Sequence, residues 1–535
     1  MATEAEVEVE KEKPKTDIEE NTRNLMQSIK STVEDSCLEK VEEKEIDVVP
    51  EVLVIGGGIA GMYAALNIAD AGFKVHMVEK TPSIGGHMAQ LDKTFPTLDC
   101  SACILTPRMV DVGGHPNINL ISYSEVVGVE GSVGNFKVKV KKNPRYVEEA
   151  ICNGCMMCED ACRVKKVPND FDIGLMKRSA IYRPFPFAIP AIYTIDAESC
   201  LMLKKGKCGK ATLESTREAR KKKEKGEEVS KNEAPPCVLA CGPNCIDHDM
   251  KEEIVELNVG AIIVATGWDI IEPELTPEYK YGVYPNVIHG LEFERYSSAS
   301  GPTSGKILVA GMPEPKDAVF ISCVGSRNKQ TGYEYCSRVC CMYLAKHAHL
   351  LKEKVPTCNI TVLYQDVRAF GKGFEEFYSH VKEEGNNYRR GLAAEIYKKP
   401  GSDRVIVRAE DTMLGEPIEI EADLVVLGVG LKPSAGTAEL LKLLGVAETA
   451  DHFAKEAHLK LRPIDTDVEG VFITGCVQAP KDIPDSVAQG KAAAAAALAL
   501  IASGKTKLRS IVTEIEEELC VGCKSLSEMA DKMGA

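Results

Sequence analysis

The sequence predicts an α/β fold of two Rossmann-like domains, with a small cysteine-rich domain inserted into the first. Three observations support this prediction. An apolar strand, a glycine turn, a helix and a second strand follow one another over residues 51–80. Regularly spaced cysteines begin at Cys152, and a further series of apolar, strand-like segments lies within residues 301–430. Strands that alternate with helical segments indicate parallel sheets joined by crossover helices.

The composition is that of a soluble globular protein. The chain has 535 residues, of which 44% are hydrophobic and 27% are charged, and this length suits roughly two to four domains. The net charge of −15 argues against nucleic acid or an anionic membrane as the main partner. No segment resembles a signal peptide, and the apolar stretch at 492–502 is shorter than the roughly 20 residues of a membrane span.

We therefore expect a cytoplasmic protein with reduced thiols. In such a compartment the 20 cysteines are expected to be metal ligands or redox groups rather than structural disulfides. Residues 1–49 are expected to form an acidic tail and a docking helix. The tail is too charged to fold alone, and apolar residues recur at near-helical spacing over 25–41.

Residues 51–80, "EVLVIGGGIAGMYAALNIADAGFKVHMVEK", carry a dinucleotide-binding fingerprint. Its three G-x-G-x-x-G glycines permit a tight turn, a close approach of the backbone to a pyrophosphate, and close packing of the helix on its strand. The second strand ends in an acid, which is placed to bond a ribose hydroxyl. The residues expected at the cofactor in this segment are Gly56, Gly57, Gly58, Ile59, Ala60, Gly61, Glu79 and Lys80.

Three further segments favour FAD over NAD as the dinucleotide. They are "TPSIGGHMAQ" (81–90), "AIIVATGWD" (261–269) and "DTDVEGVFITGCVQAP" (465–480). Together with the fingerprint they resemble the FAD domain of the glutathione and thioredoxin reductase superfamily, in which an interrupted FAD domain brackets a second Rossmann-like domain. The resemblance implies an FAD-binding domain in three parts, at residues 51–145, 251–300 and 431–510.

The same resemblance enlarges the expected FAD site to include Gly85, Gly86, His87, Met88, Ala265, Thr266, Gly267, Gly475, Cys476 and Gln478. One departure concerns the last of these segments. The superfamily usually has Gly-Asp where this chain has Gly475-Cys476, and the Asp there bonds the flavin ribityl chain. Gln478 or a backbone amide could replace that contact.

Residues 146–250 are expected to form an inserted bacterial-type ferredoxin domain with two [4Fe–4S] clusters. The C-x2-C-x2-C-x3-C run of such ferredoxins is present at Cys152, Cys155, Cys158 and Cys162. Three thiolates of that run bind one cluster and the fourth binds its neighbour. This exchange rule assigns one cluster to Cys152, Cys155, Cys158 and Cys241, and the other to Cys162, Cys200, Cys208 and Cys237. Cys245 competes with Cys241 as a ligand, and the residue order favours Cys241.

Residues 301–430 occupy the place of the second Rossmann-like domain. Strands are expected at 306–312, 318–324, 359–365 and 424–430, and none of their turns carries G-x-G-x-x-G. In place of a phosphate loop the chain has Cys323, Cys336, Cys340 and Cys341. We expect these four to bind a metal cluster, one from a strand end and three from the first turns of a helix that begins near Cys336, because a helix N-terminus favours thiolate. Buried free cysteines are the alternative.

Three stretches resemble the A subunit of heterodisulfide reductase, which is the flavin subunit of an enzyme of methanogens with relatives in other anaerobes. They are residues 91–109 ("LDKTFPTLDCSACILTPRM"), the ferredoxin insertion, and residues 323–348. The resemblance spans roughly residues 40–515. It implies FAD and three [4Fe–4S] clusters, one of them beside the flavin at the four cysteines between 323 and 341.

The resemblance also implies an electron-transfer function within a complex. The flavin would split electron pairs from a hydrogenase or formate dehydrogenase module between ferredoxin and a disulfide-reducing partner (CoM-S-S-CoB or similar). Disulfide-reductase-type B and C subunits are the implied partners, and the chain would form a homodimer within the larger complex. Family members commonly have a longer N-terminal domain and a second terminal ferredoxin domain. Here Cys520 and Cys523 form half a motif, so residues 511–535 are expected to be a truncated ferredoxin remnant.

Lys346 is the candidate catalytic residue, as a contact to the flavin N5, because it lies five residues past Cys341 on the same expected helix. A solvent-facing lysine is the alternative. Two other functions stay open. Cys100 and Cys103 could serve a dithiol–disulfide flavoenzyme, with or without NAD(P)H, and the chain could be a non-bifurcating electron conduit. Flavin potentials would decide, and protein groups around the flavin set them.

Overall fold

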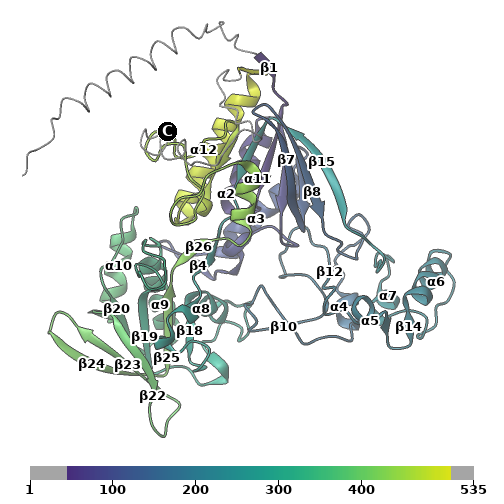
Figure 1. Ribbon diagram of the computed structural model, residues 1–535. Helices are drawn as coiled ribbons and strands as arrows, with labels where there is room; N and C mark the ends of the chain where they lie inside the picture. The colour runs from purple at the N-terminus through teal and green to yellow at the C-terminus, as the bar shows by residue number, and fades with distance from the viewer. Residues whose placement is uncertain (1–44, 508–535) are drawn as a thin grey trace, which may run out of the picture. The chain divides into compact units, whose positions relative to one another are not determined.

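The computed structural model describes residues 45–507, within which Asp47–Thr506 form one compact body. The expected docking helix at 25–41 and the half motif at Cys520 and Cys523 lie outside the described residues. The body contains two five-stranded parallel sheets, and its cysteine-rich insertion leaves from a smaller antiparallel sheet (Figure 1).

The first parallel sheet has the strand order β27-β16-β2-β3-β6. These strands are β2 (Glu51–Ile55), β3 (Lys74–Glu79), β6 (Ile118–Ser122), β16 (Ala261–Val264) and β27 (Val471–Ile473). Strand β16 is an apolar run buried along its whole length, as expected of a parallel strand covered on both faces. The helices of this domain are α2 (Ile59–Asp70), α3 (Ser101–Gly114) and α12 (Ile483–Ala502).

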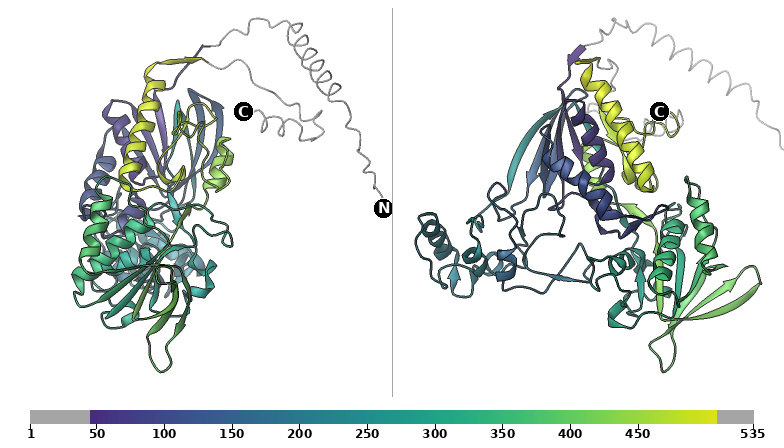
Figure 2. Two further views of the ribbon diagram at one scale, coloured as in Figure 1. Left: turned by 90° about the vertical axis from the view of Figure 1, so that its left-hand side faces the viewer. Right: turned by 180° about the vertical axis from the view of Figure 1, so that it is seen from behind.

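Helix α12 packs beside α2, as Figure 2 shows for the yellow and purple helices. Gly490 permits this close approach, because a Cβ there would lie 2.5 Å from the Ala60 carbonyl oxygen. The many alanines of α12 also leave little side-chain volume between the helices. The approach holds α12 against the first turn of α2, next to the glycine fingerprint.

The antiparallel sheet has the order β15-β8-β7. Its strands are β7 (Ser124–Ser132), β8 (Asn135–Lys142) and β15 (Glu253–Val259). Along β8 exposed lysines alternate with buried apolar residues, which is typical of a strand with one face on the core. The chain leaves at the end of β8 and returns at the start of β15, and these two strands pair directly. The insertion at 143–252 therefore starts and ends at one place.

The insertion contains short helices and three small hairpins. The helices are α4 (Met157–Ala161), α5 (Leu201–Lys205), α6 (Leu213–Glu224) and α7 (Pro236–Ala240). The hairpins pair β9 (Val167–Pro168) with β10 (Lys177–Arg178), β11 (Ile181–Tyr182) with β12 (Thr194–Ile195), and β13 (Lys207–Cys208) with β14 (Ala211–Thr212). Arg145 anchors the insertion, because its buried guanidinium donates to the Pro82 carbonyl (2.9 Å) and the Ser122 hydroxyl (2.6 Å).

The second parallel sheet has the order β18-β25-β19-β20-β21. Its strands are β18 (Val287–His289), β19 (Asp317–Val324), β20 (Asn359–Tyr364), β21 (Asn387–Arg390) and β25 (Leu424–Val429). The helices are α8 (Gly290–Ser297), α9 (Cys340–Lys354) and α10 (Phe374–Glu383), and a separate antiparallel sheet contains β22 (Ala393–Lys398), β23 (Val405–Asp411) and β24 (Glu416–Ala422). The chain then runs through β26 (Leu431–Pro433), which pairs with β17 (Trp268–Ile270), and α11 (Thr437–Leu444).

The structure corrects two expectations for this domain. Residues 306–312 form no strand, because Ala310 and Gly311 both have positive φ and their segment is a short 3-10 turn at Val309–Gly311. The fifth strand of the sheet is β18 instead, so residues 287–300, expected in the FAD domain, pair and pack with the second domain. Of the described residues, no helix combines the length and the hydropathy needed to cross a membrane.

Candidate functional site

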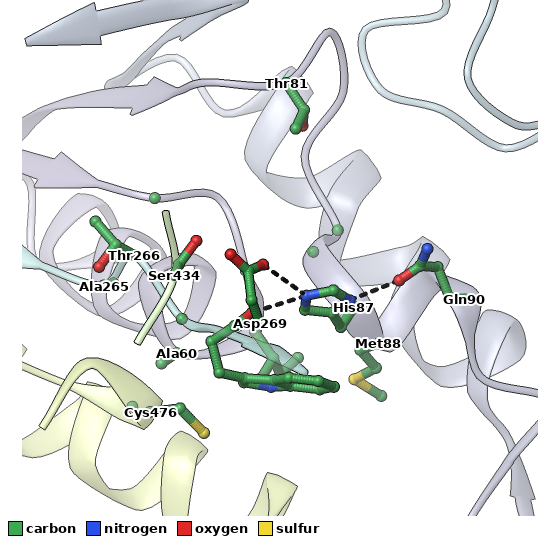
Figure 3. A pocket seen from close by; sticks show the side chains of 18 of the residues that line it. Ala60, Thr81, His87, Met88, Gln90, Ala265, Thr266, Asp269, Ser434 and Cys476 are labelled. Atoms are coloured by element: carbon green, nitrogen blue, oxygen red, sulfur yellow. Dashed lines mark hydrogen bonds and ion pairs between the residues drawn. The ribbon is translucent and has the colours of Figure 1, made fainter. Parts of the chain in front are cut away.

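A cavity of about 850 Å³ lies between the first parallel sheet, the insertion and the second domain. It is lined by the glycine turn before α2, by insertion residues such as Phe171 and Tyr182, and by Lys346 of α9. Figure 3 shows part of its lining, with Thr266, Ser434 and Cys476 on different segments around the cavity. The volume falls within the range of cofactor pockets, which are usually about 300–1,000 Å³.

The glycine turn is shaped to receive an anion. Gly56 has φ of +109°, and a Cβ there would lie 2.3 Å from the Ala265 carbonyl oxygen. A Cβ on Gly61 would lie 2.0 Å from the Gly56 oxygen, so this glycine lets the helix pack on its strand. Within the described residues no side chain caps α2, and no atom lies within 4 Å of a Cβ built on Gly58. Uncapped N–H groups beside open space suit a pyrophosphate.

Glu79 holds this turn in place. One carboxylate oxygen accepts the N–H of Gly57 at 2.7 Å, and the other accepts the N–H of Thr81 at 2.8 Å. Of the residues expected at FAD, those that line the cavity are Gly56, Gly58, Ile59, Ala60, Glu79, Lys80, Gly85, Gly86, His87, Met88, Ala265, Thr266, Gly267, Gly475 and Cys476. Gly57, Gly61 and Gln478 do not line it.

Substituting Gly58 by alanine is expected to weaken FAD binding about tenfold or more without unfolding the chain. The added methyl meets open space in the protein itself, so only a bound pyrophosphate would clash with it. Flavin content of the purified protein and the Kd for added FAD would measure the effect. Gly114→Ala is the matched control, since its Cβ also meets nothing, at the far end of α3. Equal FAD affinity in both variants would contradict the proposed pyrophosphate position.

A polar group around His87 was missed by sequence reasoning. The His87 ring stacks on Trp268 with centroids 4.0 Å apart, and its Nε2 lies 2.7 Å from the Trp268 carbonyl oxygen. Its Nδ1 lies 2.6 Å from Gln90 Oε1, and Asp269 lies on its other side (Figure 3). Trp268 is the only tryptophan of the sequence. Its place at the cavity depends on the pairing of β17 with β26, which no local pattern indicates.

Lys481 occupies the region where the superfamily has its Gly-Asp pair. Its ammonium group donates to the carbonyl oxygens of Gly475 (2.7 Å) and Ala479 (2.8 Å) and to Gln478 (3.0 Å). Burial lowers the pKa of Lys481 to about 8. Cys476 is buried and turns its thiol toward the Lys481 carbonyl oxygen (3.4 Å). Gln478 therefore binds Lys481 instead of lining the cavity, and a cation stands near the position of the missing carboxylate.

Lys346 faces the cavity as a buried ion pair rather than as a surface lysine. Its side chain is almost fully buried; its ammonium contacts the Glu294 carboxylate and donates to the Lys93 carbonyl oxygen at 2.7 Å. His347 contacts the same carboxylate through Nε2. Burial raises the pKa of Glu294, but Lys346 and His347 outweigh that effect and lower it to about 2. Glu294 also accepts the N–H of Asp92 (3.0 Å), so it joins α8 and α9 to the loop before β4 (Lys93–Thr94).

The four cysteines of the second domain lie close together. Cys323 interacts electrostatically with Cys336 and Cys341, and Cys340 interacts with all three. Helix α9 begins at Cys340, not near Cys336, so Cys336 belongs to the preceding loop. Burial raises the pKa of Cys323 to about 11 and that of Cys340 well above its ordinary value. Burial therefore outweighs the lowering of the thiol pKa that was expected from the helix N-terminus. The positive charge of a metal would be needed to form the thiolates.

The cysteines of the insertion form the two groups that the exchange rule assigns. Burial raises the pKa of Cys237, and Cys162, Cys200 and Cys208 add to that shift as near neighbours. Burial also raises the pKa of Cys158 to about 12, with Cys241, Cys152 and Cys155 contributing in that order. Each group thus contains thiols from both halves of the insertion. This is the interleaving that two neighbouring clusters require.

Cys245 joins the first of these groups as a fifth thiol. Its sulfur lies 3.4 Å from the sulfur of Cys241, and both are buried. A hydrogen bond from Cys245 lowers the pKa of Cys152 and of Cys241. Cys245 is thus placed to hydrogen-bond both Cys152 and Cys241.

Cys100 and Cys103 form a disulfide at the start of α3. Both residues are exposed, and neither lines the cavity formed by the described residues. Strand β5 (Asp99–Cys100) pairs with β4, so Cys100 lies opposite Lys93, whose carbonyl oxygen binds Lys346. This is the pair named as a candidate redox group in the sequence.

The fold and the site define a class: an α/β protein with a dinucleotide-type cavity and groups of neighbouring cysteines. A family model described as "FAD binding domain" matches residues 51–90. Among solved structures, thioredoxin reductase of T. acidophilum is similar at 16% identity over 84% of this chain and 99% of that chain, with a TM-score of 0.44. The description of the fold above depends on the strand orders alone and not on this similarity.

Curated relatives identify the family. The chain is 47% identical over 92% of its length, and 70% of the relative's, to the A subunit of the H(2):CoB-CoM heterodisulfide,ferredoxin reductase of Methanothermobacter marburgensis. It is 46% identical, over 96% of its length and 74% of the relative's, to the iron-sulfur A subunit of the CoB--CoM heterodisulfide reductase of Methanocaldococcus jannaschii. A third relative is the A subunit of the H(2)/formate:CoB-CoM heterodisulfide,ferredoxin reductase of Methanococcus maripaludis. The two are 44% identical over 95% of this chain and 73% of the relative. The chain belongs to the family of heterodisulfide reductase A subunits, which are oxidoreductase subunits.

Proposed function

We propose that this chain splits electron pairs at a bound FAD, sending one electron toward ferredoxin and the other toward a disulfide-reducing partner. The observation that carries the proposal is the presence, in one compact body, of a dinucleotide-type cavity and three groups of cysteines. Three groups suit three [4Fe–4S] clusters, two in the insertion and one at Cys323, Cys336, Cys340 and Cys341. FAD exchanges one or two electrons, whereas each cluster exchanges one.

The chain's own residues would hold and tune these groups. The N-terminus of α2 would bind the pyrophosphate, and Glu79 keeps the glycine turn in the required shape. Lys346 would present its ammonium group to the flavin, because it is buried at the cavity wall and oriented by Glu294. A fixed cation beside a flavin favours its reduced, negatively charged forms. Burial of these groups also excludes water from the reacting atoms.

The partners follow from the names of the relatives, which mention H2, formate, ferredoxin and CoB-CoM heterodisulfide. We extend these to this chain: a hydrogenase or formate dehydrogenase module supplies electron pairs, ferredoxin accepts single electrons, and B- and C-type subunits reduce the heterodisulfide. We also propose that the chain is cytoplasmic and forms a homodimer within that complex. Two electron pairs supply four electrons. Two of these electrons, with two protons, reduce one disulfide, and the other two reduce two one-electron ferredoxin sites.

A dithiol–disulfide flavoenzyme is the second candidate, and the Cys100–Cys103 disulfide is the observation that favours it. Two features weigh against it. The disulfide lies outside the cavity, and the second domain has cysteines where a nicotinamide-binding glycine loop would be needed. A conduit that transfers electrons without splitting pairs would use the same cofactor sites, so a coupled assay must separate it from the main proposal.

The assay uses the complex assembled with B- and C-type subunits and the H2- or formate-oxidising module. We expect ferredoxin reduction to require heterodisulfide and to proceed at two reduced sites per disulfide. Ferredoxin reduction that is absent, or independent of the disulfide, would show a conduit. The variant Cys100→Ser/Cys103→Ser is expected to keep full coupled activity, since the pair is exposed and does not line the cavity. Loss of activity in that variant would favour the dithiol–disulfide enzyme instead.

A further inference from the structure

Two helices of the second domain bring a pair of histidines and a carboxylate together outside the cavity. His349 projects from α9, and His380 lies in the last turn of α10, four residues before Glu384 at the end of that helix. One potential ligand atom from each residue lies within 4.8 Å of the others. Neither the FAD cavity nor the three groups of cysteines uses any of these residues.

The distances within this trio leave part of the carboxylate unused. Glu384 Oε1 lies 2.6 Å from Nδ1 of His349 and 3.4 Å from Nε2 of His380. The second oxygen, Oε2, is buried and has no hydrogen-bond partner among the described residues. A buried acceptor without a partner is costly, because it has lost its hydrogen bonds to water. A cation held by the carboxylate and the two imidazoles would remove that cost.

The chemistry of the trio selects the cation. Two imidazoles and one carboxylate are ligands of Zn²⁺ and similar divalent transition ions, whereas Mg²⁺ and Ca²⁺ prefer oxygen ligands alone. Bonds of about 2.0–2.2 Å in a tetrahedral site keep ligand atoms roughly 3.3 Å apart. The distance from His380 to Glu384 already fits, and the hydrogen bond from His349 would open slightly as metal bonds replace it. The His380 side chain is 61% exposed, so an ion can enter and keep a water ligand.

We propose that His349, His380 and Glu384 form a binding site for one divalent transition-metal ion of the Zn²⁺ type. The site would fasten α10 to α9, the helix that begins with Cys340 and carries Lys346 three residues before His349. A second contact supports this coupling: Glu353, one turn beyond His349, pairs with Lys93 (3.1 Å), whose carbonyl oxygen binds Lys346. The ion would therefore steady the helix that supports the cavity wall. This proposal does not depend on the proposed electron-splitting function.

The test uses anaerobically purified holoprotein with its iron and flavin contents recorded. Loosely held metal is removed with a chelator, and Zn²⁺ is then titrated in competition with a chromophoric chelator. We expect one Zn²⁺ per chain, and a loss of affinity of about tenfold or more in His380→Ala, an exposed position where the substitution leaves the core intact. Glu384→Gln keeps the size of the side chain while removing its charge, and it should lose affinity to a similar extent.

The matched control is His452→Ala. His452 is an exposed histidine paired with a glutamate four residues away in the sequence, Glu448 (3.4 Å), but it belongs to no group of three potential ligands among the described residues. This variant should bind Zn²⁺ as the wild type does, and Zn²⁺ should raise the Tm of both by a few degrees with no change in iron content. Wild-type affinity in His380→Ala, or zinc uptake only when iron is lost, would overturn the proposal.

Discussion

Replacing Cys340 and Cys341 together by alanine is expected to lower the iron content from about twelve to about eight atoms per chain while FAD stays bound, since each [4Fe–4S] cluster holds four irons. Both residues open α9 and interact with Cys323 and Cys336. Removing two of the four thiols leaves too few ligands for a cubane. The FAD fingerprint lies in the other parallel sheet, so flavin content should be unchanged.

Iron, acid-labile sulfide and flavin per chain, measured on anaerobically purified protein, give the result. Cys358→Ala is the matched control, because Cys358 is a buried free cysteine of the same domain that lies just before β20 and outside the group of four. Its iron content should equal that of the wild type. If wild-type protein holds only about eight irons, or the double variant keeps about twelve, the third cluster does not exist at these cysteines.

Substituting Lys346 by methionine is expected to cost about 3–5 kcal/mol of stability and to make the flavin midpoint potential more negative by tens of millivolts. The cost follows from leaving the Glu294 carboxylate buried without its main cationic partner. The change in potential follows from removing a positive charge at the cavity wall, where about 30 mV corresponds to about 1.4 kcal/mol for a two-electron couple. Denaturation and a reductive titration followed by flavin absorbance would measure both effects.

The double variant Glu294→Gln/Lys346→Met separates charge from packing. Replacing both members of a buried ion pair by neutral groups of similar size is often close to neutral for stability, so the double variant should recover much of the loss seen in Lys346→Met. The flavin potential should stay shifted, because the cation is still absent. A potential equal to that of the wild type in both variants would contradict the placement of Lys346 at the flavin.

The pH dependence of this pair has a definite sign. The ordinary pKa of a glutamate, 4.5, falls to about 2 for Glu294 in the folded chain. A carboxyl with a lowered folded pKa contributes stability that is fully present above the ordinary pKa and is lost as the pH falls through the folded pKa. The stability difference between wild type and Glu294→Gln should therefore be flat above pH 4.5 and shrink toward pH 2. The same comparison in a His347→Gln background removes the other titrating group on this carboxylate, and a slope near neutral pH there would contradict the lowered pKa of Glu294.

Local patterns predicted those parts of the site that depend on neighbouring residues. The fingerprint at Gly56, Gly58 and Gly61 forms the expected turn, because strand, turn and helix are consecutive and glycine alone tolerates the contacts with Ala265 and with the turn itself. The spacing of Cys152, Cys155 and Cys158 likewise favours one common group, since thiols three residues apart in a loop can meet at one cluster. Expectations that depended on the pairing of strands far apart in the sequence were less accurate. The strand expected at 306–312 is replaced by β18, which pairs with β25 far along the chain.

The sequence by itself determined the dinucleotide fold, the two halves of the insertion and the cysteine-bearing second domain. It did so because the spacing of glycines and cysteines and the apolar runs are local properties of the chain. Only the tertiary structure decided which charged groups face the cavity. Glu294 comes from a segment with no functional motif of its own and reaches the cavity through helix packing. Trp268 and Lys481 lie at or just after the ends of segments expected at FAD, but neither was expected at the cofactor. Burial then sets their chemistry: it makes Lys346 a fixed cation paired with Glu294, and it raises the thiol pKa values that the helix N-terminus was expected to lower.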